Sequence, residues 1–551
     1  MAEIAENIKT PDKIDLILER LQNLESDFSR YQTIRSECAK YSWPAVQDMV
    51  KVTTDQATGS QVRTVDIYDA TPRRSSNKMA TGIFANMYPP GVRWIELKAS
   101  NDELPEDEAL KEWLSKATDI TLKEILRSNF QNEKISKIRS KIVFGDGTIS
   151  VQMSKDTDKL VFKTYHVSNI VYDENCDGMI DTVFRKILWT ARQVRQKFPK
   201  ADLGKTIEDA LKKGDNRTKF EIIHAVYPRE DYDPEKTLSK ESKRFVSIYI
   251  NRTDKKIIEE ENGYDDMPYI VGRFDVIPDE LVGIGLVAEM LPDIKMTNSM
   301  CKTFAESSEK QGNPPIILED DGVVGQPNVS PGGVIYKRSG ADDPKPMQTG
   351  VNSALNAEII RQYKMDIEEG FSMSLFDVLR GLRNMTASEV VQRTNDSLTL
   401  LSAFVSSEQQ DMDLLIERVV NLLIEAKKIP APPVKDFGYD IVYHGRLSMA
   451  MNAVQAGAIE QFLAKWSPYN ELSPVMDNFD LDEAAKTSAY AEGVPAKLIR
   501  RKSDVDADRQ ARQERKEKAE ALAMADAASK AYKNASVTAQ PNSMASAMMG
   551  A

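Results

Sequence analysis

Apolar residues recur at helical spacing in several stretches of the chain. Within residues 69–94 they lie four residues apart from Met79 to Met87, and two consecutive prolines end the pattern because proline cannot donate a helical hydrogen bond. Thr71 suits the N-cap of this helix and Pro72 its first position. The same periodicity predicts further helices over residues 12–50, 106–140, 448–466 and 503–532.

Residues 141–275 show a different pattern. Short runs of alternating or β-branched residues, such as KIVFGDGTISVQM, KLVFKTYHV, KFEIIHAVY and RFVSIYINR, are followed by Gly, Asn or Asp. This pattern predicts strands joined by turns and hairpins. The middle of the chain is therefore expected to be mixed α and β structure.

A third pattern occupies residues 286–428. Apolar residues spaced by about 3.5 predict one helix over 286–312, which Pro292 either starts or kinks, and a second over 353–374. The turn-rich residues between them predict a small β-rich tip. A capping box at Thr386–Glu389 then opens a helix of about forty residues, which is long for a compact globule.

Composition narrows the class of protein. A chain of 551 residues is too long for one hydrophobic core, so at least two domains are expected. The net charge of −12 argues against nonspecific nucleic-acid binding through a basic surface. Three isolated cysteines fit a reducing compartment. Without a signal-peptide pattern, or an apolar run near the roughly 20 residues of a membrane span, we expect a soluble intracellular protein without membrane insertion.

The sequence contains no recognisable catalytic or cofactor motif. It has no GxxxxGK[ST] phosphate loop and no GxSxG elbow. Gly283 and Gly285 have the spacing of a dinucleotide fingerprint, but no βαβ pattern surrounds them. Residues 173–178 match half of a calcium loop, but Phe184 stands where that loop needs a glutamate. The histidines, His166, His224 and His444, are expected to be structural. We therefore expect a non-enzymatic protein with no cofactor and no metal.

Several segments resemble, in order along the chain, the head-to-tail connecting (portal) proteins of short-tailed bacteriophages. The segments are PPGVRWIEL (89–97), FGDGTISV (144–151), DENCDGMIDTVFRK (173–186), the helical stretch 283–318 that ends at a double proline, NMTASEVVQRTND (384–396) and GVPAKLIRRKSDVDADRQARQ (493–513). Their order and spacing make the resemblance fairly specific. It covers most of residues 30–515.

The resemblance implies a mainly helical α+β subunit of the portal type. Such a subunit has an α/β wing, a two-helix stem, a small β-rich clip inserted between the stem helices, a channel loop, a long wing helix and a helical crown. The corresponding residues are 1–291 for the wing, 292–312 and 353–370 for the stem helices, 313–352 for the clip, 371–385 for the channel loop, 386–470 for the long wing helix and its return, and 471–533 for the crown. A disordered tail is expected over 534–551.

The resemblance also implies a homo-oligomeric ring, a dodecamer, at one capsid vertex of the virion, assembled in the host cytoplasm. Double-stranded genomic DNA passes through such a ring during packaging and ejection, without sequence-specific contacts. The implied partners are the terminase large subunit, the major capsid protein and scaffold, and tail adaptor or nozzle proteins. An acidic chain suits a conduit, because a strongly positive lining would hold the DNA phosphates.

The candidate functional residues are charged side chains in these parts. Those that could face the DNA channel are Arg361, Lys364, Arg380 and Arg383, and intersubunit salt bridges are the alternative for each. Clip residues that could dock terminase or tail proteins are Glu319, Asp320, Asp321, Lys337, Arg338, Asp342 and Asp343. Arg73, Arg74 and Lys78 lie near a helix start, where the helix dipole disfavours positive charge. They form either a solvated face or a subunit interface.

Two other function classes fit the sequence less well. A DNA-processing component of the packaging machinery, such as a terminase subunit or a nuclease, is disfavoured because the sequence has no phosphate loop and no clustered acidic metal site. A scaffolding protein is disfavoured because the strand-rich residues 141–275 do not suit a mostly helical scaffold.

Overall fold

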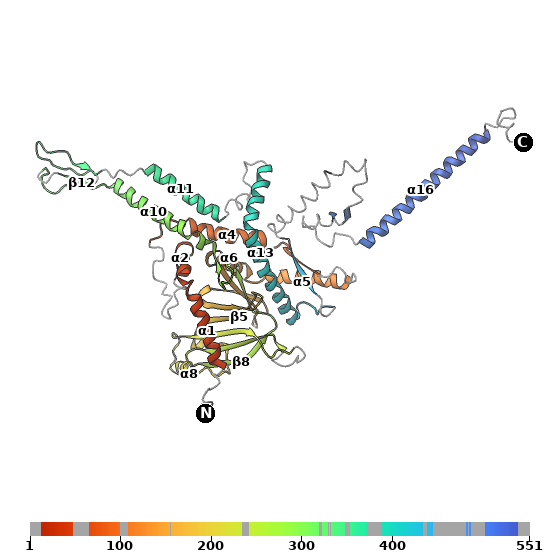
Figure 1. Ribbon diagram of the computed structural model, residues 1–551, viewed down its shortest axis with the longest axis horizontal. Coiled ribbons are helices and arrows are strands. Elements are labelled where there is room, and N and C mark those ends of the chain that lie inside the picture. The colour runs from red at the N-terminus through yellow and green to blue at the C-terminus, as the bar shows by residue number, and fades with distance from the viewer. Residues whose placement is uncertain are drawn as a thin grey trace, which may run out of the picture. The chain divides into compact units, whose positions relative to one another are not determined.

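In a computed structural model of the chain, two units can be distinguished, Met1–Met451 and Asn452–Ala551. The structure describes residues 13–47, 66–99, 108–154, 156–233, 242–318, 322–328, 330, 332–347, 353–371, 387–433, 438–444, 465, 481–482, 484–485 and 502–537. Figure 1 follows the chain from its first helix to its last. None of the described helices is both long and apolar enough to cross a membrane.

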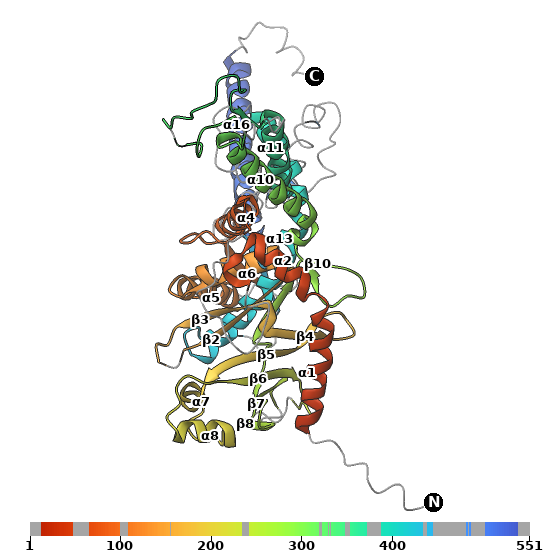
Figure 2. The same ribbon diagram turned by 90° about the vertical axis from the view of Figure 1, so that its left-hand side faces the viewer.

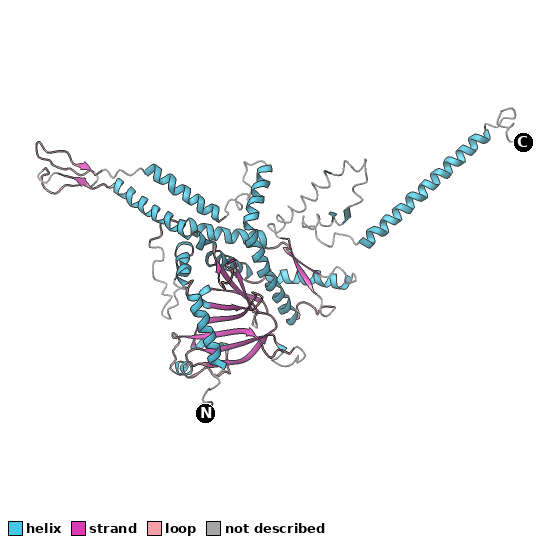
Figure 3. Cartoon of the chain, viewed as in Figure 1, coloured by secondary structure: helices cyan, strands magenta, loops and turns pink. Residues whose placement is uncertain are grey.

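The first unit contains a five-stranded antiparallel sheet in the order β4-β5-β6-β7-β8 (Figure 3). The strands are Ile170–Glu174, Ile180–Thr190, Lys219–Pro228, Phe245–Asn251 and Lys256–Tyr264. Every residue of β7 is buried, and its neighbours point to opposite faces as the two-residue period requires. Ile248 packs under α1 (Lys13–Ser29), whereas Tyr249 packs under α7 (Ala191–Lys197) and α8 (Lys205–Lys212). Helices therefore cover both faces of this sheet (Figure 2).

A smaller sheet, in the order β3-β2-β9, joins this region to the main core. Its strands are Leu160–Tyr165, Asp146–Met153 and Tyr269–Arg273. The prediction of a strand from Lys141 onward is wrong at its start, because KIVF forms the last turn of α6 (Phe130–Phe144). Three consecutive buried apolar residues in that turn fit a buried helix as well as a strand. Gly145 ends the helix with a φ of 88°, in the left-handed region that favours glycine.

Two predicted single helices are wrong because each is a pair. Residues 12–50 form α1 and α2 (Gln32–Ser42), followed by the short helix η1 (Pro44–Val46). Residues 106–140 fall in α5 (Glu108–Leu126) and α6, and Ser128 between them donates to the Ile125 carbonyl and accepts from the Phe130 amide. Each half is amphipathic, so the apolar period continues across the break while the chain changes direction.

Helix α4 (Thr71–Met87) ends before the two prolines as predicted, but its predicted cap is wrong. Ala70 occupies the N-cap position, and Asp69 takes over the capping role. The Asp69 Oδ1 accepts from the backbone N–H of Thr71 at 3.2 Å and from its hydroxyl at 2.8 Å. A carboxylate at this end of a helix is favourable to the helix dipole.

The predicted long helix is confirmed as α13 (Ala387–Glu425, 39 residues). Val405, Met412, Leu415 and Val419, on its predicted apolar seam, are fully buried in the core of the same subunit. The subunit's own core therefore covers the apolar face of the second half of this helix. The capping residue Thr386 lies outside the described residues.

The remaining elements are short or lie in the second unit. In the first unit they are β1 (Ile95–Ala99) paired with β14 (Tyr439–Tyr443), β10 (Asp275–Val276) paired with β11 (Gly283–Ile284), η2 (Val167–Asn169) and α9 (Leu286–Glu289). The second unit contains α16 (Lys502–Val537), whose residues 508–530 are all exposed, in agreement with its polar sequence. This helix continues four residues into the tail that was expected to be disordered from residue 534.

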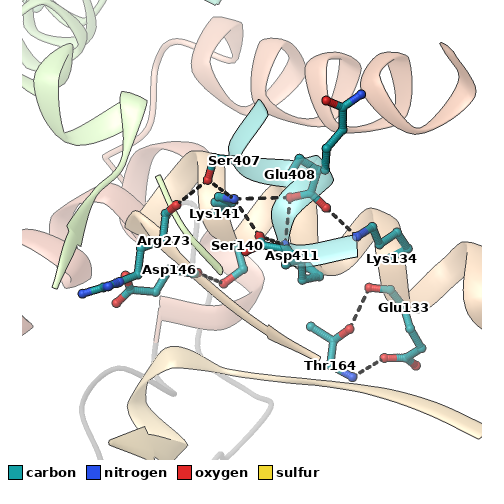
Figure 4. A network of polar contacts seen from close by, with 12 residues as sticks. Glu133, Lys134, Ser140, Lys141, Asp146, Thr164, Arg273, Ser407, Glu408 and Asp411 are labelled. Atoms are coloured by element: carbon teal, nitrogen blue, oxygen red, sulfur yellow. Dashed lines mark hydrogen bonds and ion pairs between the residues drawn. The ribbon is translucent and has the colours of Figure 1, made fainter. Parts of the chain in front are cut away.

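A buried charge cluster fastens α13 to α6 (Figure 4). Lys134, Lys137 and Lys141 of α6 are fully buried, and they surround Glu408 and Asp411 of α13. Lys137 Nζ lies 2.8 Å from Glu408 and also contacts Asp411, and Lys141 Nζ lies 2.7 Å from Asp411. Lys134 Nζ lies 2.5 Å from Glu408, but without the alignment of a hydrogen bond.

Three buried cations therefore face two carboxylates, which leaves one excess positive charge. Burial lowers the pKa of Lys134 to about 8, even though Glu408 favours its charged form. Burial would raise the pKa of Glu408, but the three lysines outweigh it and hold this pKa well below its usual range. Lys134 is the member of the cluster whose charge is least compensated.

We predict that Glu408→Gln destabilises the first unit far more than Lys134→Met. The glutamine would leave three lysines facing one carboxylate, and such uncompensated buried charge costs about 3–5 kcal/mol of unfolding free energy. Lys134→Met leaves two lysines and two carboxylates, and should cost less than about 1 kcal/mol. Urea unfolding followed by tryptophan fluorescence measures both; equal losses would contradict this account of the cluster.

The same lysine predicts a pH dependence. Its folded-state pKa of about 8 lies below its ordinary value of 10.5, so the unfolded chain binds this proton more tightly. Linkage then makes the wild-type chain gain stability relative to Lys134→Met as the pH rises from about 8 to about 10. A stability difference that stays constant over this range would show that Lys134 titrates normally.

Candidate functional site

Two long helices form a hairpin that projects from the first unit. Helices α10 (Leu291–Gly312) and α11 (Ser353–Gly370) lie side by side in both views (Figures 1 and 2). Pro292 stands in the first turn of α10, so it starts the helix and does not kink it. At the far end, β12 (Ile316–Ile317) pairs with β13 (Lys345–Pro346), and Val323 bridges to Lys337. The predicted β-rich tip is present in the described part of the chain.

The hairpin leaves large apolar side chains in solvent. Met296 of α10 and Met365 of α11 are each 53% exposed, and Tyr336 at the tip is 70% exposed. Further exposed apolar residues of the tip are Ile317, Val324, Val334 and Met347. Single exposed apolar residues are normal, but this gathering on one thin projection marks a candidate interaction surface.

The charged residues predicted at the tip are partly paired with one another. Lys337 Nζ lies 2.6 Å from Asp343, and Lys345 Nζ lies 2.7 Å from Asp342. The hydrogen bond from Lys345 lowers the pKa of Asp342. The Arg338 backbone N–H donates to the Gly322 carbonyl at 3.0 Å, which helps to close the loop. Three further predicted residues, Glu319, Asp320 and Asp321, lie outside the described residues.

The two described cations that were predicted to face a channel differ in exposure and in ion-pair partner. Arg361 is 70% exposed at its side chain and pairs within its own helix with Glu358, at 2.9 Å. Lys364 is only 38% exposed and lies 3.3 Å from the buried carboxylate of Asp69. The other two, Arg380 and Arg383, lie outside the described residues.

The pair between Lys364 and Asp69 belongs to a joint at the base of the hairpin. Asn298 of α10 accepts from the backbone N–H of Tyr68 at 2.7 Å and donates to the Asp66 carbonyl at 3.0 Å. Asp69 then caps α4 while it pairs with α11. Both helices of the hairpin are thus tied to the segment that precedes α4.

The three cations near the start of α4 do not share one setting. Arg73 and Arg74 are exposed and line a pocket of about 630 Å³ with Trp43, Asn77 and Arg139. Lys78 is half-buried one turn further on and is not among the lining residues. Sequence reasoning missed Arg139, because it comes from α6, far from the other cations in the sequence.

The apparent nucleotide and calcium motifs have structural roles. A Cβ added at Gly283 would lie 2.8 Å from the Gly145 carbonyl oxygen, and one added at Gly285 would lie 2.7 Å from the Gly145 amide nitrogen. The two glycines of the supposed fingerprint therefore permit close backbone packing. In the supposed calcium loop, the Asn175 side chain accepts from two backbone N–H groups of the β4–β5 turn. The described residues contain no group of ligands suited to a metal ion.

The three histidines make contacts within the fold. His224 is fully buried, bonds to the Tyr269 hydroxyl at 2.6 Å and the Ser247 hydroxyl at 2.9 Å, and stacks on Tyr249. Burial holds its pKa well below the usual range, so it stays neutral. Burial also lowers the pKa of His166 to about 4. His444 lies 3.3 Å from Glu96.

Comparisons with known proteins identify the family. The model of the bacteriophage head to tail connecting protein family matches residues 15–499. The chain belongs to this family. It is 25% identical over 450 residues to the "Probable portal protein" of Bordetella phage BPP-1, covering 79% of this chain and 80% of that protein. It is 23% identical over 489 residues to the "Portal protein" of Salmonella phage epsilon15, covering 86% and 87%.

Sequence reasoning missed the buried charge cluster between α6 and α13. A signal was present: three lysines spaced by three and four residues on one helix, and two acids three residues apart on another. Such spacing puts each set on one helix face. It is also typical of solvated helix faces, and the two sets are about 270 residues apart in sequence, so periodicity alone could not pair them.

The joint at the hairpin base gives a testable expectation. Asp69→Asn removes a helix cap charge and the partner of Lys364, and should cost about 0.5–2 kcal/mol locally. Hydrogen–deuterium exchange should rise at the start of α4 and in the middle of α11. The matched control is Glu358→Gln, which breaks only an exposed pair of about 0.5 kcal/mol. Equal exchange in the two variants would argue against the joint.

Proposed function

We propose that copies of this chain assemble into the portal ring of a tailed bacteriophage, at the junction of head and tail. Double-stranded DNA passes through the ring during packaging and again during ejection. The ring acts as a conduit and docking platform, and chemical work is left to a separate packaging motor. The observation that carries this proposal is the family match over residues 15–499, which spans the α/β region and the projecting hairpin together.

The arrangement of elements supports a division into portal parts. The hairpin of α10 and α11 has the length and exposure of a stem, and the paired segments at its end have the place of a clip. The α/β region with α13 corresponds to the wing, and α16 to part of the crown. Exposed apolar residues such as Met296 and Met365 then lie where neighbouring stems would pack.

Charge on the stem supports weak contact with DNA. Arg361 is exposed and paired only within its helix, so it can exchange Glu358 for a passing phosphate. Lys364 is partly committed to the buried Asp69, which makes it the weaker candidate of the two. We retain Arg380 and Arg383 as candidates for the channel loop. DNA can slide past a few cations in an acidic chain, because each additional phosphate contact would strengthen the salt-dependent binding of DNA.

The clip is the proposed docking site for a terminase and, after packaging, for tail proteins. Its described lysines pair with nearby aspartates of the clip. Its apolar residues, above all Tyr336, stay exposed in the described structure. Aromatic anchors inside a polar rim are typical of protein interfaces. We also place Glu319, Asp320 and Asp321 in this docking surface.

Imaging tests the portal proposal directly. Negative-stain microscopy of the purified full chain should show rings with a central hole, and mass photometry should give one multiple of the 61.9 kDa subunit, with twelve copies expected. Monomers that cleave DNA in the presence of a divalent metal would instead favour a packaging nuclease and would refute the proposal.

The clip assignment has its own test. Ile317 and Lys345 face each other in the β12–β13 pair, so a two-residue Asn-Gly turn can replace residues 318–344 without disturbing that pair. Rings should persist in this variant, while terminase-dependent DNA packaging should be lost. Loss of ring assembly would mean that these residues belong to the ring contact instead.

A further inference from the structure

The basic pocket at the start of α4 contains three arginines. Arg73 and Arg74 come from α4, Arg139 comes from α6, and Trp43 closes the pocket from the end of α2. The Arg139 guanidinium lies over the Trp43 ring at 4.5 Å and donates to the Ser42 carbonyl at 3.0 Å. These two contacts fix the guanidinium in place. The pocket is therefore a preformed cationic site.

Among the described residues, no carboxylate neutralises the positive charge of this pocket. None of the described carboxylates forms an ion pair with any of its three arginines. The Arg139 Nε is buried and makes no hydrogen bond in the described structure. Burial, together with the nearby charge of Arg73, lowers the pKa of Arg139 to about 10. An anion would relieve both the repulsion and the unsatisfied donor.

The lining favours a carboxylate on a polypeptide over the backbone of duplex DNA. Trp43, Pro44 and Ala45 give one wall an apolar character, and Asn77 adds an amide. The planar forks of arginines match carboxylates in two-point contacts, and the apolar wall suits the carbon atoms of a peptide. Duplex DNA is instead bound by stripes of cations that follow its backbone, not by one pocket with an apolar wall.

The chain itself supplies a matching acidic segment. Five of the seven residues from Asp102 to Glu108 are acidic, and they flank Leu104 and Pro105. Helix α5 begins at Glu108 and packs on β1 and α13, whereas the pocket lies between α2, α4 and α6. Figure 1 shows α5 and α2 on opposite sides of α6. The pocket and the helix that follows the acidic segment thus lie on opposite sides of α6, as a head-to-tail contact in a closed ring requires.

We propose that the pocket formed by Trp43, Arg73, Arg74 and Arg139 binds the acidic segment 102–108 of a second copy of this chain. The inference rests on the proposed ring, and it names one contact that holds neighbouring wings together. The segment's carboxylates enter between the arginines, and Leu104 or Pro105 covers the apolar wall. The net charge of −12 makes an acidic partner surface readily available on the second copy.

Charge exchange in the full-length chain tests the contact. Arg73→Glu with Arg74→Glu should raise the protomer concentration for half-maximal ring assembly by about tenfold, as expected for the loss of close charge pairs across an interface. Glu106→Arg with Asp107→Arg should have an effect of the same size. Combining all four substitutions should restore assembly to within about threefold of wild type, a rescue that misfolded variants cannot give. Mass photometry at several NaCl concentrations measures each midpoint.

The matched control is Lys212→Glu with Lys213→Glu, which makes the same charge change at two exposed adjacent cations at the end of α8. It should leave the midpoint within about twofold of wild type, given that exposed charges contribute little. An equal effect in the control, or no rescue in the fourfold variant, would overturn the inference while wild-type rings still uphold the portal. Unchanged assembly with weaker binding of a duplex DNA probe by Arg73→Glu/Arg74→Glu would assign the pocket to DNA. Absence of wild-type rings would refute both proposals.

Discussion

The buried charge cluster between α6 and α13 is the constraint on which the first unit depends. Lysine side chains are rarely buried, and three of them lie together here because Glu408 and Asp411 meet them from the facing helix. Buried ion pairs often add little net stability over apolar packing, yet they tolerate no shift in register. A one-residue rotation of α13 would separate the carboxylates from the lysines. The cluster thus fixes where this long helix lies against the α/β core.

The hairpin is fixed to the same core by a second polar joint. Asn298 and Lys364 reach the segment before α4 from the two different helices of the hairpin, and Asp69 links that segment to the helix start. Because α4 in turn packs on α6, the base of the hairpin and the long helix α13 are both anchored to α6. The proposed docking role of this projection needs such a rigid base, since its far end would otherwise amplify any motion.

Periodicity predicted the elements well and their breaks badly. The long helix and the helical hairpin were predictable because their apolar spacing continues over many turns, and α13 is found where the pattern places it. The break near Tyr31 was not predictable, because both helices stay amphipathic while α1 faces the five-stranded sheet and α2 faces α4 and α6. The partners of charged residues were harder to predict than the helix breaks. The sequence assigned Lys364 to the channel or to an intersubunit salt bridge, and only the fold reveals Asp69 beside it.

These placements also narrow where ring contacts can form. The apolar residues in the second half of α13 are buried inside one subunit. In the proposed ring, contacts between copies would therefore use surfaces that the described part of the subunit leaves exposed. Two such surfaces stand out: the exposed methionines of the hairpin and the pocket of unpaired arginines beside Trp43. The methionines supply apolar area, and the pocket supplies directional charge. A head-to-tail contact that closes into the proposed ring requires both affinity and a fixed angle between copies.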